Sequence, residues 1–371
     1  MKKILIVFGT RPEAIKMAPV IKKFIDEVGS FSVYICSTGQ HREMLDQVLS
    51  FFDIHPDFDL ALMRSGQNLY QLTSDVIMGM KEVLEKLNPD YVFVHGDTTT
   101  SSAAALASFY AGATVCHVEA GLRTYNKQSP FPEEVNRQLT ARIADIHFAP
   151  TQKAAENLIK EGVQKKQIFV TGNTVIDALL TASEKLIGYC DSEIEYLKNV
   201  LHENKKIILV TGHRRENFGG GFAAICGAIK DIAENEDVQV VYPVHMNPNV
   251  LEPVNKYLSG CNNVHLVKPL AYPAFLWLMK KSNIILTDSG GVQEEAPSLG
   301  KPVLVMRETT ERPEAVEAGT VLLVGTDRHR INSAVTRLLR DESAYLTMSN
   351  AHNPYGDGKA SERILKILKE L

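Results

Sequence analysis

Cysteine is sparse in this 371-residue chain, and its five occurrences are scattered rather than paired. No CxxC pair is present, which argues against a zinc site and against a disulfide framework. Isolated thiols fit a reducing compartment, so the sequence predicts a cytoplasmic protein. The positions are Cys36, Cys116, Cys190, Cys226 and Cys261.

Long apolar runs are also missing, since no stretch approaches the roughly 20 apolar residues that span a bilayer. The N-terminal run Ile4–Phe8 is followed at once by Arg11 and Glu13, without a small-residue cleavage site. We therefore interpret this run as a buried strand rather than a signal peptide, and we expect no membrane partner.

The chain lacks a large excess of either charge, because its formal net charge is only −4. Such a balance gives no general attraction for nucleic acid, so an anionic ligand must be held by local groups. HExxH and GxSxG are absent, and Gly300-Lys301-Pro302 lacks the other residues of a Walker A sequence. The GxGxxA match at 219–224 starts too far past its strand to bind NAD in the usual way.

What is present is an alternation of short β-branched runs with longer helical patterns, such as 13–27, 69–87, 222–234 and 272–281. Continuous apolar strands separated by amphipathic helices predict parallel sheets covered on both faces. The expected strands are Ile4–Phe8, Phe31–Ser37, Tyr91–His95, Thr114–Val118, Ile168–Val170, Ile207–Val210, Val238–Val244, Val264–Val267, Ile284–Thr287, Val303–Met306 and Val321–Val324.

An internal echo indicates two domains. The opening KKILIVFGTR is matched later by KKIILVTGHR, and each pairs two lysines with an apolar strand and a turn that carries an arginine. A fresh first strand in mid-chain predicts a second doubly wound domain. We expect Rossmann-like domains at residues 1–172 and 173–358, which face each other across a cleft.

Ligands of such sheets bind beyond the carboxyl ends of the strands. After the first strand, Arg11 precedes Pro12 at a predicted helix N-terminus, where the helix dipole favours anions, and Lys16 follows about one turn later. Taken alone, these residues fit an ordinary strand-to-helix turn as well as they fit an anion-binding site. The equivalent turn of the second half carries His213 and Arg214, and this repetition favours a binding function.

Three carboxylates follow strands or start a helix in the first half. Asp97 follows Tyr91–His95 and could simply cap a helix, while Glu119 ends a buried strand and could simply pair with Arg123. Glu133 lies in an expected first helical turn, where acidic residues are common. Their convergence on strand-end positions of one domain favours acid–base chemistry.

In the second half, Ser289-Gly290-Gly291 starts a predicted helix and offers backbone N–H groups to a diphosphate. Glu295, about one turn further on, is placed to accept ribose hydroxyls. A flexible turn is an equally good explanation from the local sequence. His245 follows another strand, where a lone histidine is more often structural.

Taken together, these motifs resemble the non-hydrolysing UDP-N-acetylglucosamine 2-epimerases of bacteria. The resemblance runs in order from Gly9 to about Gly325, through GTRPEAIKMAPV, TGQHREML, VHGDTTT, HVEAGLRT, SPFPEEVNRQL, TGHRRENFG, PVHMNPNV, TDSGGVQEEAP and RETTERPEAVEAGT. It implies a fold like that of GT-B glycosyltransferases, with the last helix, 359–371, packing back on the first domain. It also implies a homodimer.

The resemblance further implies a mechanism, in which UDP leaves carbon 1 as a proton leaves carbon 2, giving 2-acetamidoglucal without a metal or NAD. Asp97, Glu119 and Glu133 would be the acid–base carboxylates, with the face served by each left open, and His213 would assist departure of UDP. The substrate-binding residues would be Arg11, Lys16, Arg137, Arg214, His245, Phe275, Ser289, Gly290, Gly291, Glu295 and Arg312. A second site, where the substrate activates the enzyme, would include Gln40, His41 and Arg64.

Three other functions fit the same residues. A 2-epimerase could act on a UDP-2-acetamido sugar that is already modified at carbon 3 or 6. A GT-B glycosyltransferase would use the same nucleotide domain but would need an acceptor cleft. A non-enzymatic sensor would use the carboxylates only to bind hydroxyls.

Overall fold

The computed structural model describes residues 1–39, 42–64 and 66–371 as two compact units. The first unit contains Met1–Thr181 and Tyr355–Leu371, and the second contains Ala182–Pro354. The chain leaves the first unit within helix α7, Thr174–Lys185, a little beyond the boundary expected at residue 172. It returns at Tyr355, slightly before the expected 359.

The first unit is built on a seven-stranded parallel sheet whose strand order is β3-β2-β1-β4-β5-β6-β7. All five strands expected here are present. The strands are β1 (Lys2–Phe8), β2 (Phe31–Ser37), β3 (Phe58–Asp59), β4 (Tyr91–His95), β5 (Thr114–Val118), β6 (Ile146–Ala149) and β7 (Ile168–Val170). Two strands were not predicted from the sequence: β3, which has two residues, and β6, which has four.

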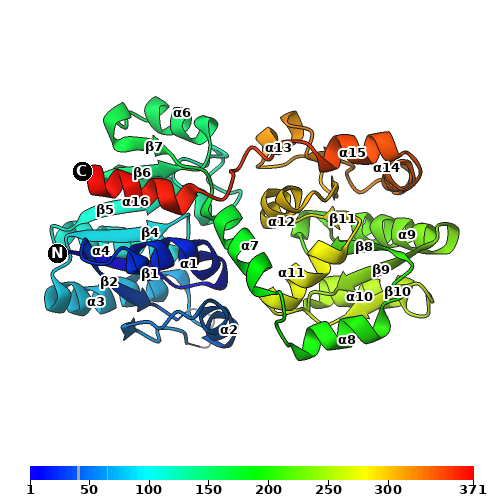
Figure 1. Cartoon of the computed structure of the whole chain (residues 1–371), viewed down its shortest axis with the longest axis horizontal. Coiled ribbons are helices and arrows are strands. Elements are labelled where there is room, and N and C mark those ends of the chain that lie inside the picture. The colour runs from blue at the N-terminus through cyan, green and yellow to red at the C-terminus, as the bar shows by residue number, and fades with distance from the viewer. Residues whose placement is uncertain (40–41, 65) are drawn as a thin grey trace. The chain divides into compact units, whose positions relative to one another are not determined.

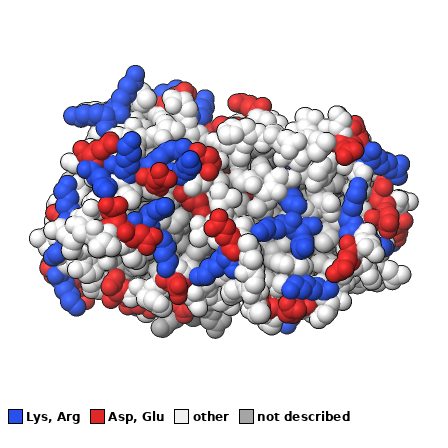
Figure 2. Space-filling model, in the orientation of Figure 1, with Lys and Arg blue, Asp and Glu red and all other residues white. Residues whose placement is uncertain are grey.

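Helices alternate with these strands along the chain (Figure 1). They are α1 (Arg11–Asp26), α2 (Arg42–Phe52), α3 (Leu69–Leu87), α4 (Thr99–Tyr110), α5 (Glu133–Ile143), α6 (Gln152–Lys160), α7 and α16 (Ala360–Glu370). Among the described residues, no helix combines the length and apolarity needed to cross a membrane. On the face shown in Figure 2, basic and acidic side chains are interspersed, so neither sign dominates there.

The C-terminal helix α16 packs against α1 within the first unit. Lys369 at its end donates to the Glu27 carboxylate at 2.6 Å. At its start, the buried Asp177 carboxylate of α7 accepts the backbone N–H groups of Ala360 and Ser361 at 3.1 and 2.8 Å. These bonds satisfy two of the backbone donors that every helix N-terminus leaves without an intrahelical partner.

The second unit has a six-stranded parallel sheet, in the order β10-β9-β8-β11-β12-β13. The six strands expected here are all present, as β8 (Lys206–Thr211), β9 (Val238–Pro243), β10 (Val264–Val267), β11 (Ile284–Thr287), β12 (Val303–Val305) and β13 (Val321–Leu323). Its helices are α8 (Ser192–Val200), α9 (Gly220–Asn235), α10 (Pro248–Leu258), α11 (Tyr272–Lys281), α12 (Gly290–Glu295), α13 (Pro313–Glu317), α14 (Arg328–Arg340) and α15 (Glu342–Ser349).

Both sheets reverse their strand order at the first strand, between β1 and β4 and between β8 and β11. This is the Rossmann-type order, and its reversal point is where doubly wound sheets bind ligands. The central strands consist mostly of apolar residues, and Ile4–Phe8 is fully buried. Their burial on both faces explains why continuous apolar runs, rather than alternating ones, predicted these strands.

Two buried histidines lie on adjacent strands of the first sheet. His117 of β5 and His147 of β6 are at most 1% exposed, and their ring centroids are 6.5 Å apart. Burial lowers the pKa of both rings, to about 3 for His117, where the charge of His147 adds to the effect, and to about 4 for His147. Both side chains are therefore neutral in the folded protein above these values.

This pairing predicts an acid-sensitive fold. Below about pH 6.5 the unfolded chain binds protons that the folded chain excludes, so stability falls as pH drops, by about 1.4 kcal/mol per pH unit for each histidine. We expect His147→Leu to reduce this dependence by about one proton in denaturant unfolding between about pH 6.5 and 4.5. The exposed His329→Leu serves as control. An unchanged slope in His147→Leu would contradict the assignment.

Candidate active site

The turn after β1 is compact because Gly9 has no side chain. A Cβ on Gly9 would lie 2.3 Å from the hydroxyl of Thr38 and 2.4 Å from that of Thr100. The next residue, Thr10, caps α1 through a capping box with Glu13. Arg11 is then the first residue of α1, half-buried at the helix N-terminus as expected.

The buried Glu13 joins this turn to the turn after β4. Its carboxylate accepts the backbone N–H groups of Gly9 and Thr10 at 3.1 and 2.8 Å, and the hydroxyls of Thr98 and Ser101 at 2.7 and 3.0 Å. Burial raises the pKa of Glu13, although hydrogen bonds from the side chains of Thr98, Thr10 and Ser101 and from the backbone of Gly9 oppose the shift. Glu13 was not among the predicted site residues, although the Thr-x-x-Glu spacing is typical of a capping box.

The strand-end carboxylate of Glu119 lies among three polar side chains. Its Oε2 pairs with Lys16 Nζ of α1 and accepts a hydrogen bond from Asn173 Nδ2 at 2.9 Å. His95 Nε2, at the end of β4, is 3.8 Å from the same oxygen. The backbone of Glu119 is left-handed, with φ of 61°, which is uncommon for a non-glycine residue.

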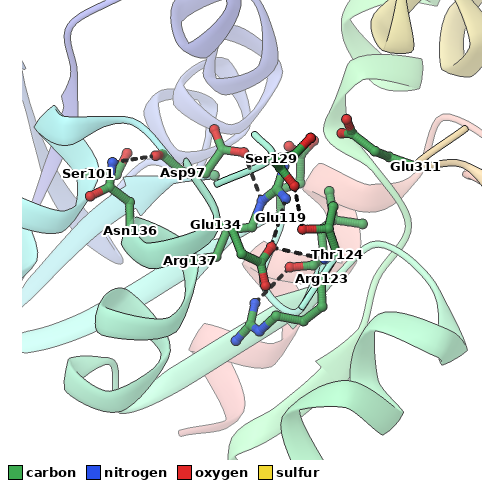
Figure 3. Close-up of polar contacts among 12 residues, drawn as sticks. Asp97, Ser101, Glu119, Arg123, Thr124, Ser129, Glu134, Asn136, Arg137 and Glu311 are labelled. Carbon is green, nitrogen blue, oxygen red and sulfur yellow. Dashed lines mark hydrogen bonds and ion pairs between the residues drawn. The ribbon is translucent and has the colours of Figure 1, made fainter. Parts of the chain in front are cut away.

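The second strand-end carboxylate, Asp97, pairs with Arg137 of α5. Arg137 donates through Nε and the terminal nitrogen Nη2, which lie 2.9 and 2.7 Å from Asp97 Oδ2. Its other terminal nitrogen, Nη1, is 3.2 Å from the carboxylate of Glu134, so one guanidinium serves two carboxylates (Figure 3). The N-cap of α4 is Thr98 rather than Asp97, which removes the ordinary capping explanation for Asp97.

The alternative pairing of Glu119 with Arg123 is not the one observed. Arg123 instead binds both oxygens of Glu161 at 2.8 Å, and its side chain is fully buried. Glu133, the third predicted carboxylate, is the half-buried first residue of α5. Its neighbour Glu134 is buried and accepts hydrogen bonds from the backbone N–H groups of Thr124 and the following residue, both at 3.0 Å.

Neighbouring strands bring Asp97 and Glu119 to one edge of the first sheet. β4 and β5 pair in register, with His95 opposite Val118, so the residues that follow each strand leave the sheet side by side. Gly96 has a left-handed φ of 64°, and a Cβ there would lie 3.5 Å from Glu119 Oε1, so the turn after β4 lies against the Glu119 carboxylate. Two carboxylates, each paired with a cation, therefore end adjacent strands.

In the second unit, the fully buried Asp288 organises the turn after β8. Its Oδ2 accepts the backbone N–H groups of His213 and Arg214 at 2.9 and 2.8 Å, and lies 3.3 Å from Asn217 Nδ2. Its other oxygen is 3.7 Å from His213 Nδ1. β8 and β11 are neighbours, so Asp288 reaches this turn from the adjacent strand end. Asp288 belongs to the motif TDSGGVQEEAP, but the sequence did not predict a function for it.

His213 and His245 stack on each other after β8 and β9, with ring centroids 5.4 Å apart and an interplanar angle of 20°. Burial lowers the pKa of His213, Asp288 opposes the shift, and Arg214 and His245 add to it. His245 therefore belongs to the same cluster as His213, rather than serving an isolated structural purpose.

Ser289 is the N-cap of the short helix α12, and Gly290 and Gly291 form its first turn. Arg312 is buried beside them, since a Cβ on Gly290 would be 3.5 Å from one of its terminal nitrogens. Its Nε donates to Glu294 at 2.6 Å. A buried cation thus adjoins the backbone donors predicted to hold a diphosphate.

Glu295 ends α12. Burial raises the pKa of the Tyr272 phenol, and the charge of Glu295 raises it further. The two side chains are therefore neighbours, and Phe275 lies half-buried one turn further along α11.

The expected second site falls partly outside the described residues, since these do not include Gln40 and His41. Arg64 is described; its side chain is largely exposed and lies 3.6 Å from Asp75. Within the described parts of the chain, no group of three or more His, Cys, Asp or Glu side chains is arranged to hold a metal ion.

Comparison with known proteins agrees with this arrangement. The sequence profile of the family described as UDP-N-acetylglucosamine 2-epimerase matches residues 23–369. A UDP-N-acetylglucosamine 2-epimerase of Campylobacter jejuni is 56% identical over 99% of this chain and 97% of its own. One from Yersinia pestis is 58% identical over 99% of this chain and 98% of its own.

Solved structures agree in fold. The UDP-GlcNAc 2-epimerase of Neisseria meningitidis, bound to UDP-GlcNAc, superposes with a TM-score of 0.92 at 50% identity, covering 100% of both chains. The Methanocaldococcus jannaschii enzyme in complex with UDP-GlcNAc and UDP superposes with a TM-score of 0.82 at 33% identity, again over 100% of both chains. The two parallel α/β sheets, the ordered strand-end motifs and these full-length similarities establish that the chain belongs to the UDP-N-acetylglucosamine 2-epimerase family.

Proposed function

We propose that this protein is an isomerase that interconverts UDP-N-acetylglucosamine and UDP-N-acetylmannosamine at carbon 2, retains the nucleotide, and needs neither metal nor NAD. The observation that carries the proposal is the pair of carboxylates at the ends of β4 and β5, each paired with a cation, in a member of this family. Acid–base chemistry needs ionisable groups that are held in place at a ligand-binding edge.

The proposed chemistry avoids a poorly stabilised carbanion at carbon 2. A base takes the carbon-2 proton as the carbon 1–oxygen bond breaks, so that a carbon 1–carbon 2 double bond forms and UDP leaves with the bonding electrons. The intermediate is 2-acetamidoglucal. Re-addition of UDP to carbon 1, with protonation of carbon 2 from the opposite face, inverts the centre.

In this proposal, the first unit supplies the carboxylates Asp97, Glu119 and Glu133 that handle the carbon-2 proton. Lys16 offsets the charge of Glu119, and Arg137 offsets that of Asp97, so both cations support the carboxylates directly. This adds a function to the phosphate binding expected for these two cations. Arg11, at the N-terminus of α1, keeps its assignment as a phosphate ligand.

The second unit, in this proposal, binds UDP. The backbone N–H groups at Ser289–Gly291 and the guanidinium of Arg312 bind the diphosphate, and Glu295 accepts the ribose hydroxyls. Phe275 contributes an apolar contact. His213, with Arg214 and His245, stabilises the departing diphosphate, and Asp288 fixes the position of His213.

We further propose that the protein is a cytoplasmic homodimer, activated by its substrate at a second site that includes Gln40, His41 and Arg64. The support is the family membership and, for Arg64, a largely exposed guanidinium.

The direct test is solvent exchange. Incubated with UDP-N-acetylglucosamine in D₂O without any acceptor, the enzyme is expected to place deuterium at carbon 2, because the removed proton exchanges before re-addition. NMR and mass spectrometry of the recovered UDP-sugars measure this. A sugar that stays fully protonated after long incubation would rule out the proposal, and release of free N-acetylmannosamine would indicate a hydrolysing enzyme. A panel of UDP-sugars modified at carbon 3 or 6 tests the substrate range.

Two adjacent glutamates offer a matched comparison of chemistry and stability. We expect Glu133→Gln to lose about 10²–10⁴ in exchange rate, as for removal of a positioned acid or base. Glu134 is different: burial favours its neutral form, but hydrogen bonds from Thr124, Gln138, Tyr125 and Arg137 prevail and lower its pKa. Glu134→Gln should therefore cost about 1–3 kcal/mol of stability.

Thermal unfolding and carbon-2 exchange, measured on both variants, separate the two functions. At a temperature where both are folded, Glu134→Gln should lose much less exchange than Glu133→Gln. If Glu134→Gln instead loses more exchange than Glu133→Gln, the assignment of the acid–base function to Glu133 is wrong.

Asp288→Asn tests how His213 is used. Asp288 opposes the lowering of the His213 pKa, so removing its charge lowers that pKa further. If His213 acts in its protonated form, the alkaline limb of the pH–rate profile moves to lower pH, by up to about one unit. Asp231→Asn, at a carboxylate that pairs with Arg328 at 2.6 Å, is the control and should not move the limb. If the alkaline limb of the pH–rate profile does not move in Asp288→Asn, His213 is not the acid whose titration produces that limb.

A further inference from the structure

Asn173 is 2% exposed, immediately precedes α7, and has no assignment in the chemistry above. Its Oδ1 accepts the backbone N–H of Val175 at 3.0 Å, and its Nδ2 donates to Glu119 Oε2 at 2.9 Å. One partner is a donor and the other an acceptor, so only one orientation of the amide satisfies both. The two ends of the side chain thus do different things, since one caps α7 and the other holds a carboxylate.

The carboxylate that Asn173 holds starts from an unusual backbone. Glu119 has a left-handed φ of 61°, which fixes the direction in which its side chain leaves the strand end. Lys16 and Asn173 both bind Oε2, while Oε1 is 3.5 Å from the position of a Cβ on Gly96. The two donors on Oε2 therefore determine which oxygen faces the turn that carries Asp97.

The position of Asn173 is itself tightly determined. Its backbone N–H donates to the carbonyl of Tyr355 at 2.7 Å, and Tyr355 is 1% exposed. Gly172 has a φ of 92°, a conformation that favours glycine, and a Cβ there would lie 3.5 Å from the same carbonyl, so the two segments are adjacent. The side-chain amide of Asn173 is therefore held close to the two segments through which the chain leaves and re-enters the first unit.

We infer that Asn173 is a positioning residue for the reaction, which orients the Glu119 carboxylate for proton transfer at the sugar. The inference rests on the proposed function, because it assigns Asn173 a task only if Glu119 takes part in the chemistry. Lys16 of α1 and His95 of β4 are the ionisable side chains that face the same carboxylate.

Asn173→Asp separates the two tasks of the side chain. Aspartate keeps an oxygen for the Val175 N–H, so the cap on α7 survives, but it replaces the donor to Glu119 with a second carboxylate. The like charge disfavours ionised Glu119, so the acidic limb of the pH–kcat profile should move to higher pH by about one unit or more. Near neutral pH we expect kcat to fall by up to about 100-fold, as a displaced catalytic group would cause, with a smaller change in KM.

Gln239→Glu is the matched control. Gln239 is fully buried in β9, accepts the backbone N–H of His202 at 2.9 Å and donates to the carbonyl of His202 at 2.7 Å. The change likewise keeps an acceptor and removes a donor, but it faces no carboxylate of the site. It should leave the pH limb in place.

Asn173→Ala is the second variant, which loses the cap and the donor without adding charge. We expect a lower Tm and a lower kcat, with a smaller displacement of the limb than in Asn173→Asp.

The outcomes distinguish this inference from the proposed function. If wild-type enzyme exchanges deuterium at carbon 2 and Glu119→Gln does not, but folded Asn173→Asp and Asn173→Ala keep the wild-type pH profile and kcat, Asn173 is only a helix cap. If wild-type enzyme exchanges nothing, the proposed function itself fails. A shifted limb in Asn173→Asp together with an unshifted limb in Gln239→Glu supports the positioning function.

Discussion

The first unit depends on how the carboxylate at the end of a buried strand is compensated. A carboxylate in such a position is costly unless cations or donors surround it, and Glu119 meets this condition through Lys16 and Asn173. These partners come from α1 and from the residue before α7, so one side chain ties together elements far apart in the sequence. The compensation that permits the charge also fixes its direction, which is what acid–base chemistry requires.

The second unit also contains a buried strand-end carboxylate, Asp288, but its charge is compensated mainly by the backbone. Asp288 is fully buried, and backbone N–H groups supply most of its hydrogen bonds, at His213 and Arg214. The Asp288 carboxylate therefore fixes the conformation of the turn after β8, and this turn carries the basic side chains of His213 and Arg214. Asp288 follows β11, beside the point where the second sheet reverses its strand order, whereas Glu119 follows β5, one strand further from the reversal point of the first sheet.

Much of this could be predicted from the sequence, because strands buried on both faces are continuous apolar runs and the residues after them are easily located. Strand β6 was missed because it is short and contains His147, whose burial depends on a neighbouring strand. Asn173 was missed because its partners, Glu119 and Tyr355, are distant in the chain. The pairing of Arg123 with Glu161 was likewise beyond sequence spacing.

The discontinuity of the first unit affects how the chain folds during synthesis. The second unit is continuous, whereas the first requires Tyr355–Leu371, which the ribosome makes after the whole of the second unit. Until then the Asp177 carboxylate lacks the N–H groups of Ala360 and Ser361, the latter 184 residues downstream. Contacts of such long range form late and slow the search for the native state. We therefore expect the first unit to complete its fold only after the second unit has been translated.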